Sequence, residues 1–195
     1  MSTIVFDIDG VLADFIKGAL DVARCLGYST PHITTREHQH WDVYPGLDEK
    51  GVEDTWKYIT DHPEFWSDLT PLAMQEELEI IEGLIEDGHR VYFATNRNKP
   101  GALEATQDWL QYFIGGSCNV VITHRKGEFC KVVDADYYID DKSENVDCAI
   151  WMTDKKTKAY VITRPYNSGV YAPHSKSARR VSTLTEFLED IHADV

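Results

Sequence analysis

Short apolar runs alternate with longer segments of helical periodicity along most of the chain. The short runs are rich in β-branched and aromatic residues and predict buried strands at residues 3–6, 90–94, 119–123, 135–139 and 159–163. The longer segments predict helices at residues 14–26, 49–60, 72–87, 102–113, 144–151 and 183–191. Strands that alternate with helices favour an α/β fold, with a Rossmann-like, mainly parallel sheet sandwiched by helices.

One stretch is too long for this alternation and predicts an insertion. Asp9 and Thr95, which follow the first and second predicted strands, are 86 residues apart, whereas a strand–helix–strand unit takes about 30 residues. The surplus is mostly helical and aromatic. We therefore predict a core domain of residues 1–13 and 73–195, with a small helical cap of residues 14–72 inserted after the first strand.

The charge of the chain narrows the range of partners. Its 33 acidic residues outnumber the 19 lysines and arginines, which gives a net charge of −14 at pH 7. Such a surface repels polyanions, so we expect neither a long nucleic acid nor an anionic membrane as the main partner. No apolar run approaches the roughly 18 residues that span a bilayer. A length of 195 residues is enough for one self-sufficient core.

Neither the N-terminus nor the cysteines indicate an oxidising compartment. The first residues lack the pattern of a secretory signal, and an acidic residue comes as early as Asp7. The four cysteines lie far apart without C-x-x-C spacing, so we expect neither a zinc site nor a disulfide framework. We predict a cytoplasmic location, and the sequence leaves open whether the chain forms a homodimer.

Two carboxylates follow the first predicted strand, in the order Asp7-Ile8-Asp9-Gly10. Residues two apart on an extended segment point the same way, so Asp7 and Asp9 should face the crevice at the carboxyl edge of the sheet. Like charges this close disfavour joint ionisation unless a cation intervenes. The arrangement suits one nucleophile and one general acid. Taken alone, the motif fits an ordinary Asp-Gly turn equally well.

Polar side chains also follow three of the later strands. Thr95 and Asn96 offer a hydroxyl and backbone amides that suit phosphate oxygens. Lys126 can neutralise a phosphate beside a carboxylate, and Asp140 and Asp141 offer the hard oxygen ligands that Mg²⁺ prefers. Taken singly, each of these residues is common elsewhere in proteins: a threonine in a helix cap, a lysine on the surface and a pair of aspartates in a turn. All of them at one sheet edge indicate an active site.

Together these groups resemble the four motifs of the haloacid dehalogenase (HAD) superfamily of phosphohydrolases. The resemblance rests on D-x-D-G-V at 7–11, a hydrophobic strand ending in Thr95, Lys126, and I-D-D at 139–141. A closer resemblance, to the 5′(3′)-deoxyribonucleotidases, rests on D-I-D-G-V-L-A-D-F at 7–15, F-W-x-x-L-x-P at 65–71, Trp109, T-H-R-K at 123–126 and R-P-Y-N at 164–167.

The resemblance implies a role for each motif residue. Asp7 would be the nucleophile that forms an aspartyl-phosphate, and Asp9 would act first as acid and then as base. Mg²⁺ would be held by the side chains of Asp7 and Asp140 and by the main-chain carbonyl of Asp9, with Asp141 in support behind them. The phosphate would be bound by Thr95, Asn96 and Lys126.

Substrate contacts are expected mainly in the cap. Phe15, Phe65 and Trp66 match aromatic positions of the nucleotidases, and aromatic rings suit stacking on a nucleobase. The core of so small an insertion would need aromatic side chains in any case. Arg97, which follows the phosphate motif, is the remaining candidate for a substrate contact.

Two departures from the nucleotidase pattern concern the substrate. Arg97 and its neighbour Asn96 stand where smaller residues and proline are expected. Lys126 and Asp140 are 14 residues apart, a few more than in that family, which leaves Lys131 as a rival for the lysine role. The expected chemistry is unaffected, but the identity of the substrate is left open.

The sequence thus predicts a Mg²⁺-dependent phosphomonoesterase for a nucleoside monophosphate, with a deoxyribonucleotide favoured. The alternatives are a HAD phosphatase for another small phosphoester or a nucleic-acid 3′-phosphate, and a non-catalytic phosphate-binding domain. The net charge of −14 argues against nucleic acid. A phospho-acceptor signalling domain would carry its lysine last, whereas Lys126 precedes Asp140.

A basic segment follows the last predicted strand. Residues 164–180 contain no acidic residue and four basic ones, Arg164, Lys176, Arg179 and Arg180. The segment shows no evident regular structure and is long for a connection within a compact domain. It follows the last predicted strand, so it starts at the carboxyl edge of the sheet, where the motif residues are expected. One hypothesis is that it draws the anionic substrate in, and the alternative is a surface loop that pairs with neighbouring acids.

Overall fold

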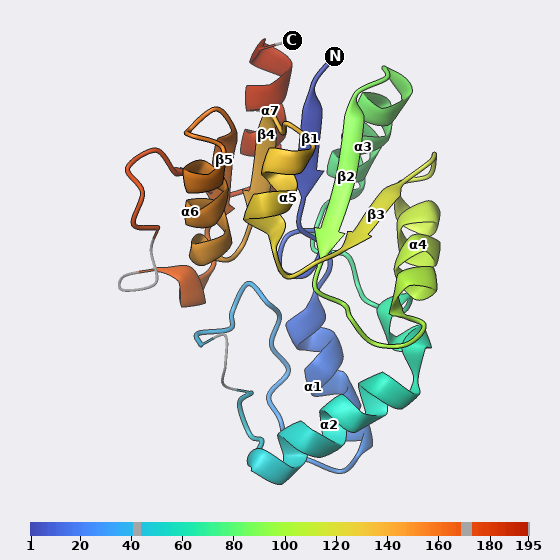
Figure 1. The fold of residues 1–195 in the computed structure, drawn as a ribbon. Coiled ribbons are helices and arrows are strands. Elements are labelled where there is room, and N and C mark those ends of the chain that lie inside the picture. The colour runs from blue at the N-terminus through green and yellow to red at the C-terminus, as the bar shows by residue number, and fades with distance from the viewer. Residues whose placement is uncertain (41–43, 169–172, 195) are drawn as a thin grey trace.

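A six-stranded sheet forms the centre of the molecule. The structure, a computed structural model, describes residues 1–40, 44–168 and 173–194. The strands lie in the order β3-β2-β1-β4-β5-β6, and all neighbouring strands are parallel (Figure 1). Their bounds are β1 Thr3–Phe6, β2 Arg90–Thr95, β3 Asn119–Ile122, β4 Tyr137–Asp140, β5 Lys158–Ile162 and β6 Arg179–Val181. The predicted α/β class with a mainly parallel sheet is confirmed.

Helices cover both faces of this sheet (Figure 1). In β1, Ile4 and Phe6 join the apolar core beneath α3 and α7, whereas Val5 joins a second core beneath α5 and α6. This division follows from the alternation of side chains along a strand. The helices are α1 Phe15–Cys25, α2 Glu49–Asp61, α3 Gln75–Glu86, α4 Ala102–Phe113, α5 Lys126–Val132, α6 Ser143–Met152 and α7 Leu184–Asp194, and the short 3₁₀ helices are η1 Pro63–Trp66 and η2 Pro165–Asn167.

The segment between β1 and α3 contains α1, α2 and η1. Figure 1 shows it beyond the carboxyl ends of the strands. The Asp14 carboxylate accepts a hydrogen bond from the Lys17 amide and so caps α1. At the base of the insertion, Ala13 bridges to Pro71, and the Leu72 amide donates to the Leu12 carbonyl at 2.7 Å. These contacts lie at the predicted boundaries, although the division into a core and a cap stays a prediction.

Four short elements were not predicted from the sequence, namely η1, α5, η2 and β6. The connection from 164 to 180, which was expected to be irregular, contains η2 and the start of β6. All four elements are too short for a clear periodic pattern, and in β6 Arg179 and Arg180 are exposed. Among the predicted helices and strands, no end differs from its observed position by more than three residues.

Within the described residues, no helix is long and apolar enough to cross a membrane. The cytoplasmic location expected from the sequence stays a prediction.

Candidate active site

The predicted motif residues gather at the carboxyl edge of the sheet. Asp7 follows β1, Thr95 ends β2 and Asp140 ends β4, while Lys126 begins α5 just after β3. The strand order brings these ends together, because β1 lies between β2 and β4. All four residues are buried. The rival Lys131 is exposed in the last turn of α5, so Lys126 is the lysine of this site.

Lys126 lies between two carboxylates. Its Nζ is 2.5 Å from Oδ1 of Asp7 and 3.0 Å from Oδ2 of Asp140. Asp140 accepts three further hydrogen bonds, from the Tyr138 hydroxyl, from Nδ2 of Asn145 and from the Lys142 amide. Both carboxylate oxygens of Asp140 are therefore occupied by protein donors. This network fixes Asp140, which in turn fixes the ammonium group of Lys126.

Burial and mutual repulsion set the ionisation of these groups. Burial, followed by the charge of Asp140, raises the pKa of Asp7 well above its ordinary value. Burial would also raise the pKa of Asp140, but Lys126 and the hydrogen bond from Tyr138 outweigh it and lower the pKa. For Lys126, burial opposes the charge, yet Asp140 and Asp7 outweigh it and raise the pKa. The ammonium group of Lys126 is thus shared between two buried carboxylates.

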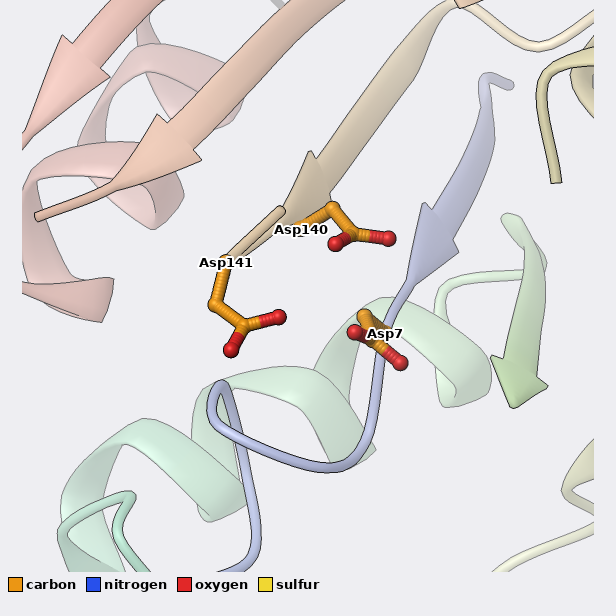
Figure 2. Close-up of side chains that lie close together, drawn as sticks. All are labelled: Asp7, Asp140 and Asp141. Atoms are coloured by element: carbon orange, nitrogen blue, oxygen red, sulfur yellow. The ribbon is translucent and has the colours of Figure 1, made fainter. Parts of the chain in front are cut away.

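Asp141 completes a cluster of three acids. Ligand oxygens of Asp7, Asp140 and Asp141 lie within 4.8 Å of one another, and Figure 2 shows all three side chains at the ends of β1 and β4. Oδ2 of Asp141 accepts a hydrogen bond from the Tyr166 hydroxyl, whereas Oδ1 is buried without a partner among the described residues. Burial, then Asp140, raises the pKa of Asp141 to about 7. An unpartnered buried oxygen among three acids suits a divalent cation.

Gly10 allows the loop after β1 to pass close to Asp141. Its φ is +85°, and a Cβ atom there would lie 2.2 Å from Oδ2 of Asp141 and 2.9 Å from the Tyr166 hydroxyl. Arg164, which is also buried, donates from Nε to the Gly10 carbonyl at 2.9 Å. The loop, the cluster of acids and the end of β5 therefore pack as one unit.

We expect Gly10→Ala to lower the free energy of unfolding by about 1–3 kcal/mol, because alanine is strained at this φ and its methyl group must displace Asp141. Gly83→Ala is the matched control. Gly83 lies within α3, and a Cβ atom there would meet nothing within 4 Å, so the control should raise stability by about 0.5–1 kcal/mol. Urea unfolding measures both. An unchanged midpoint for Gly10→Ala would contradict the tight packing of this loop.

Arg97 is bound to Asp9 and lies inside the protein. Its Nε and Nη2 are 3.0 and 2.8 Å from Oδ2 and Oδ1 of Asp9, which makes a two-pronged ion pair. The Thr95 hydroxyl donates to the same Oδ2 at 3.3 Å. The Asp9 side chain therefore faces Arg97 and is not part of the three-acid cluster, and the metal contact expected of its main-chain carbonyl stays a prediction.

A cavity of about 380 Å³ opens above the cluster, within the size range of small-molecule sites. Its aromatic wall, as we call it, consists of Phe15, Tyr44, Trp56 and Trp66. Phe15 and Trp66 stack with centroids 5.8 Å apart at an interplanar angle of 13°. Polar groups line the other side, namely Asp7, Asp9, Thr95, Asn96, Arg97, His124, Lys126, Asp141, Lys142 and Asn145.

One predicted substrate contact is absent from this lining. Phe65 is buried behind the wall, edge-on to Phe15 and Trp66 at centroid distances of 6.0 and 4.9 Å. Phe65 therefore packs in the core of the insertion, and its expected contact with substrate stays a prediction. Trp56, by contrast, was missed, since its place in a predicted helix gave no sign of which face it uses.

Tyr44 was missed as well, and the other missed lining residues are neighbours of motif residues. His124 precedes Lys126 by two positions, and Lys142 and Asn145 follow Asp141 closely. Proximity in sequence to a motif was the only signal that could have found them.

The basic segment after β5 does not line this cavity in its described part. Arg164 binds backbone carbonyls, Arg179 pairs with Asp190 at 3.2 Å, and Arg180 donates to Asn167. Lys176 is exposed. The three arginines thus have structural partners, and the hypothesis of substrate attraction stays a prediction.

The architecture has solved relatives among hydrolases. A HAD family hydrolase from Deinococcus radiodurans R1, solved with bound phosphate and sodium, has a TM-score of 0.60 at 13% identity, over 99% of this chain and 96% of that chain. A haloacid dehalogenase-like family hydrolase from Xanthomonas campestris has a TM-score of 0.55 at 13% identity, over 99% of this chain and 95% of that chain. The fold is that of the HAD-like hydrolases.

The fold and the sequence family together define the class: the protein is a HAD-type phosphoric monoester hydrolase. Its sequence narrows the class further. Residues 1–188 match the family described as "5′ nucleotidase, deoxy (Pyrimidine), cytosolic type C protein", and the chain belongs to this family. A relative from Oceanobacillus iheyensis, provisionally named nucleotidase OB0422, is 28% identical over 204 residues, which cover 95% of this chain and 96% of the relative. The expected resemblance to HAD phosphatases and deoxyribonucleotidases is confirmed.

Proposed function

We propose that the protein hydrolyses nucleoside monophosphates, deoxyribonucleotides among them, through an aspartyl-phosphate on Asp7 and with Mg²⁺ as cofactor. The observation that carries this proposal is one cavity that joins the acid and lysine cluster to the aromatic wall. The cluster suits a phosphate group, and a wall of aromatic rings suits a nucleobase. The family's description, which names a deoxynucleotidase, supports the same substrate class.

The three-acid cluster fits a Mg²⁺ ion. Asp7 and Asp141 would supply side-chain oxygens and Asp9 its main-chain carbonyl, since Oδ2 of Asp140 accepts from three protein donors whereas Oδ1 of Asp141 has none among the described residues. This reverses the roles expected for Asp140 and Asp141 from the sequence. Bound there, the ion would offset the repulsion between the phosphate and Asp7 and polarise the phosphoryl group.

The residues divide the reaction into two steps. The first step starts with Asp9 protonated: a carboxylate oxygen of Asp7 attacks phosphorus, the bond from phosphorus to the ester oxygen breaks, and Asp9 gives that oxygen its proton. Then water attacks the aspartyl-phosphate, Asp9 takes a proton from the water, and free Asp7 and inorganic phosphate are released. Lys126 and Asn96 would bind the phosphate oxygens, and the Thr95 hydroxyl would join them once it gives up its hydrogen bond to Asp9.

A substrate panel tests the proposal. Nucleoside 5′- and 3′-monophosphates, deoxy and ribo, are compared with sugar phosphates and glycerol phosphate at equal Mg²⁺ concentration. We expect kcat/KM to be highest for nucleotides. Equal or better turnover of base-free esters would favour a general small-molecule phosphatase, and no turnover of any ester would favour a phosphate-binding domain.

We expect the aromatic wall to contribute to nucleotide binding, so its loss should raise KM. Trp56 lies in α2, is partly buried and lines the cavity, so Trp56→Ala should raise KM for a nucleotide about tenfold or more, with glycerol phosphate unaffected. The magnitude follows from about 1–3 kcal/mol for stacking one base on one ring. Trp151→Ala is the matched control, since Trp151 is 77% exposed and does not line the cavity. A parallel rise for both substrates would contradict base stacking.

A further inference from the structure

We propose that Arg97 is a positioning residue that fixes the Asp9 carboxylate for proton transfer and anchors it to the aromatic wall. This inference rests on the proposed function, which assigns the proton transfer to Asp9. It concerns a residue that was expected to touch the substrate and that departs from the pattern of the resembling nucleotidases.

The contact with Asp9 is the first part of the argument. Two N–H groups of one planar guanidinium reach both oxygens of the carboxylate, at 3.0 and 2.8 Å. Such a pair fixes the plane of the carboxylate as well as its distance, which a lysine in the same place could not do. Both residues line the cavity, but the Arg97 side chain is 1% exposed and that of Asp9 is 18% exposed, so Asp9 is the more accessible of the two.

Arg97 is itself held from two directions. Its Nη1 donates to the Thr106 hydroxyl in α4 at 3.0 Å, and its Cζ lies 4.8 Å from the centroid of the Trp66 ring in η1. Thr106 belongs to the core, whereas Trp66 belongs to the insertion and stacks on Phe15. A continuous set of contacts therefore runs from the aromatic wall through Arg97 to Asp9.

This geometry differs from that of a phosphate-binding arginine. Three N–H groups of Arg97 already donate to Asp9 and Thr106, and the cation stacks on an aromatic ring. The group available to the leaving oxygen is the Asp9 carboxylate. Arg97 thus acts on the reaction through Asp9, by holding the acid where the ester oxygen departs.

The effect of replacing Arg97 on kcat should depend on the leaving group of the ester. An alkyl ester such as a nucleotide needs a proton as its bond to phosphorus breaks, whereas nitrophenolate leaves readily without one. A general acid contributes about 10² to 10⁴ to the rate, and a misplacement of 1 Å can cost about 10². Arg97→Lys should therefore lower kcat about 10²-fold for a nucleotide and less than about tenfold for nitrophenyl phosphate, with KM changed little.

The test measures kcat and KM on both esters for wild type, Arg97→Lys, Asp9→Asn and the double variant. If Arg97 acts through Asp9, the double variant should be no slower than Asp9→Asn alone. Arg24→Gln is the matched control, because that arginine also pairs with a carboxylate, Asp21, but lies outside the cavity lining. It should leave both esters unchanged.

Thr106→Val provides a second variant should Arg97→Lys fold poorly. This substitution removes the hydrogen bond from Arg97 to the Thr106 hydroxyl and keeps the charges of Arg97 and Asp9. We therefore expect kcat to fall more for the nucleotide than for nitrophenyl phosphate, by smaller factors than in Arg97→Lys. Equal losses on both esters, or losses that add to those of Asp9→Asn, would overturn the role of Arg97 and leave the proposed function intact. A folded wild type that hydrolyses neither ester would overturn both.

Discussion

Replacing Asp7 with asparagine should lower kcat by about 10³-fold or more, because an amide cannot serve as the attacking carboxylate. Asparagine is nearly isosteric and can still accept the hydrogen bonds that the Ile8 amide and Lys126 give to Oδ1. The loss should therefore appear in kcat with the fold preserved. Acid-quenched mixtures with ³²P-labelled substrate should label the wild type and leave the variant unlabelled.

Asp108→Asn is the control for this experiment. Asp108 is exposed on α4 and does not line the cavity, so the change removes one negative charge without touching the cluster. It should retain wild-type kcat. Near-normal turnover by Asp7→Asn, in protein shown to be free of contaminating phosphatase, would refute the covalent mechanism.

The order of elements could be predicted because each long element carries its own signal. The β-branched and aromatic run at Thr3–Phe6 and the helix that Asp14 caps need no distant contact to be recognised. The carboxyl edge of a parallel sheet then collects whatever follows its strands. The positions of Asp7, Thr95 and Asp140 after three such strands were therefore enough to predict that they lie together.

The elements that escaped prediction depend on packing with neighbours. β6 has three residues, and its strand form depends on pairing with β5. The first turn of α5 lies against α6 so closely that a Cβ atom on Gly127 would come within 2.5 Å of Cys148 Sγ. Such tertiary contacts leave no periodic trace in the sequence.

Within the site, residue types could be predicted but their partners could not. Asp140 and Asp141 are adjacent and chemically identical, and only the structure shows that Tyr138, Asn145 and Lys126 bind the first. Likewise, nothing in the spacing of Arg97 indicates that it turns inward to Asp9. A motif gives the chemistry of a site, whereas the hydrogen-bond network decides which member carries out each part.

Removal of the divalent cation should abolish turnover, and Asp141 should be its main ligand after Asp7. Three buried carboxylates lie close together and Lys126 contacts two of them, so an ion of charge +2 would relieve repulsion that Lys126 does not offset. EDTA should stop hydrolysis, and added Mg²⁺ should restore it. Asp141→Asn should weaken cation binding by at least about tenfold, since even residues that only support metal ligands cost about 10 to 100-fold.

Calorimetric titration with Mg²⁺, or electron paramagnetic resonance with Mn²⁺, measures that affinity independently of activity. Asp140→Asn should change it less, because its oxygens already accept bonds from Lys126, Tyr138 and the Lys142 amide. The main effect of that substitution should fall on kcat, through the position of Lys126. Asp108→Asn again serves as the control for charge. If Asp140→Asn weakens the cation and Asp141→Asn does not, the assignment expected from the sequence is right and the one drawn from the hydrogen bonds is wrong.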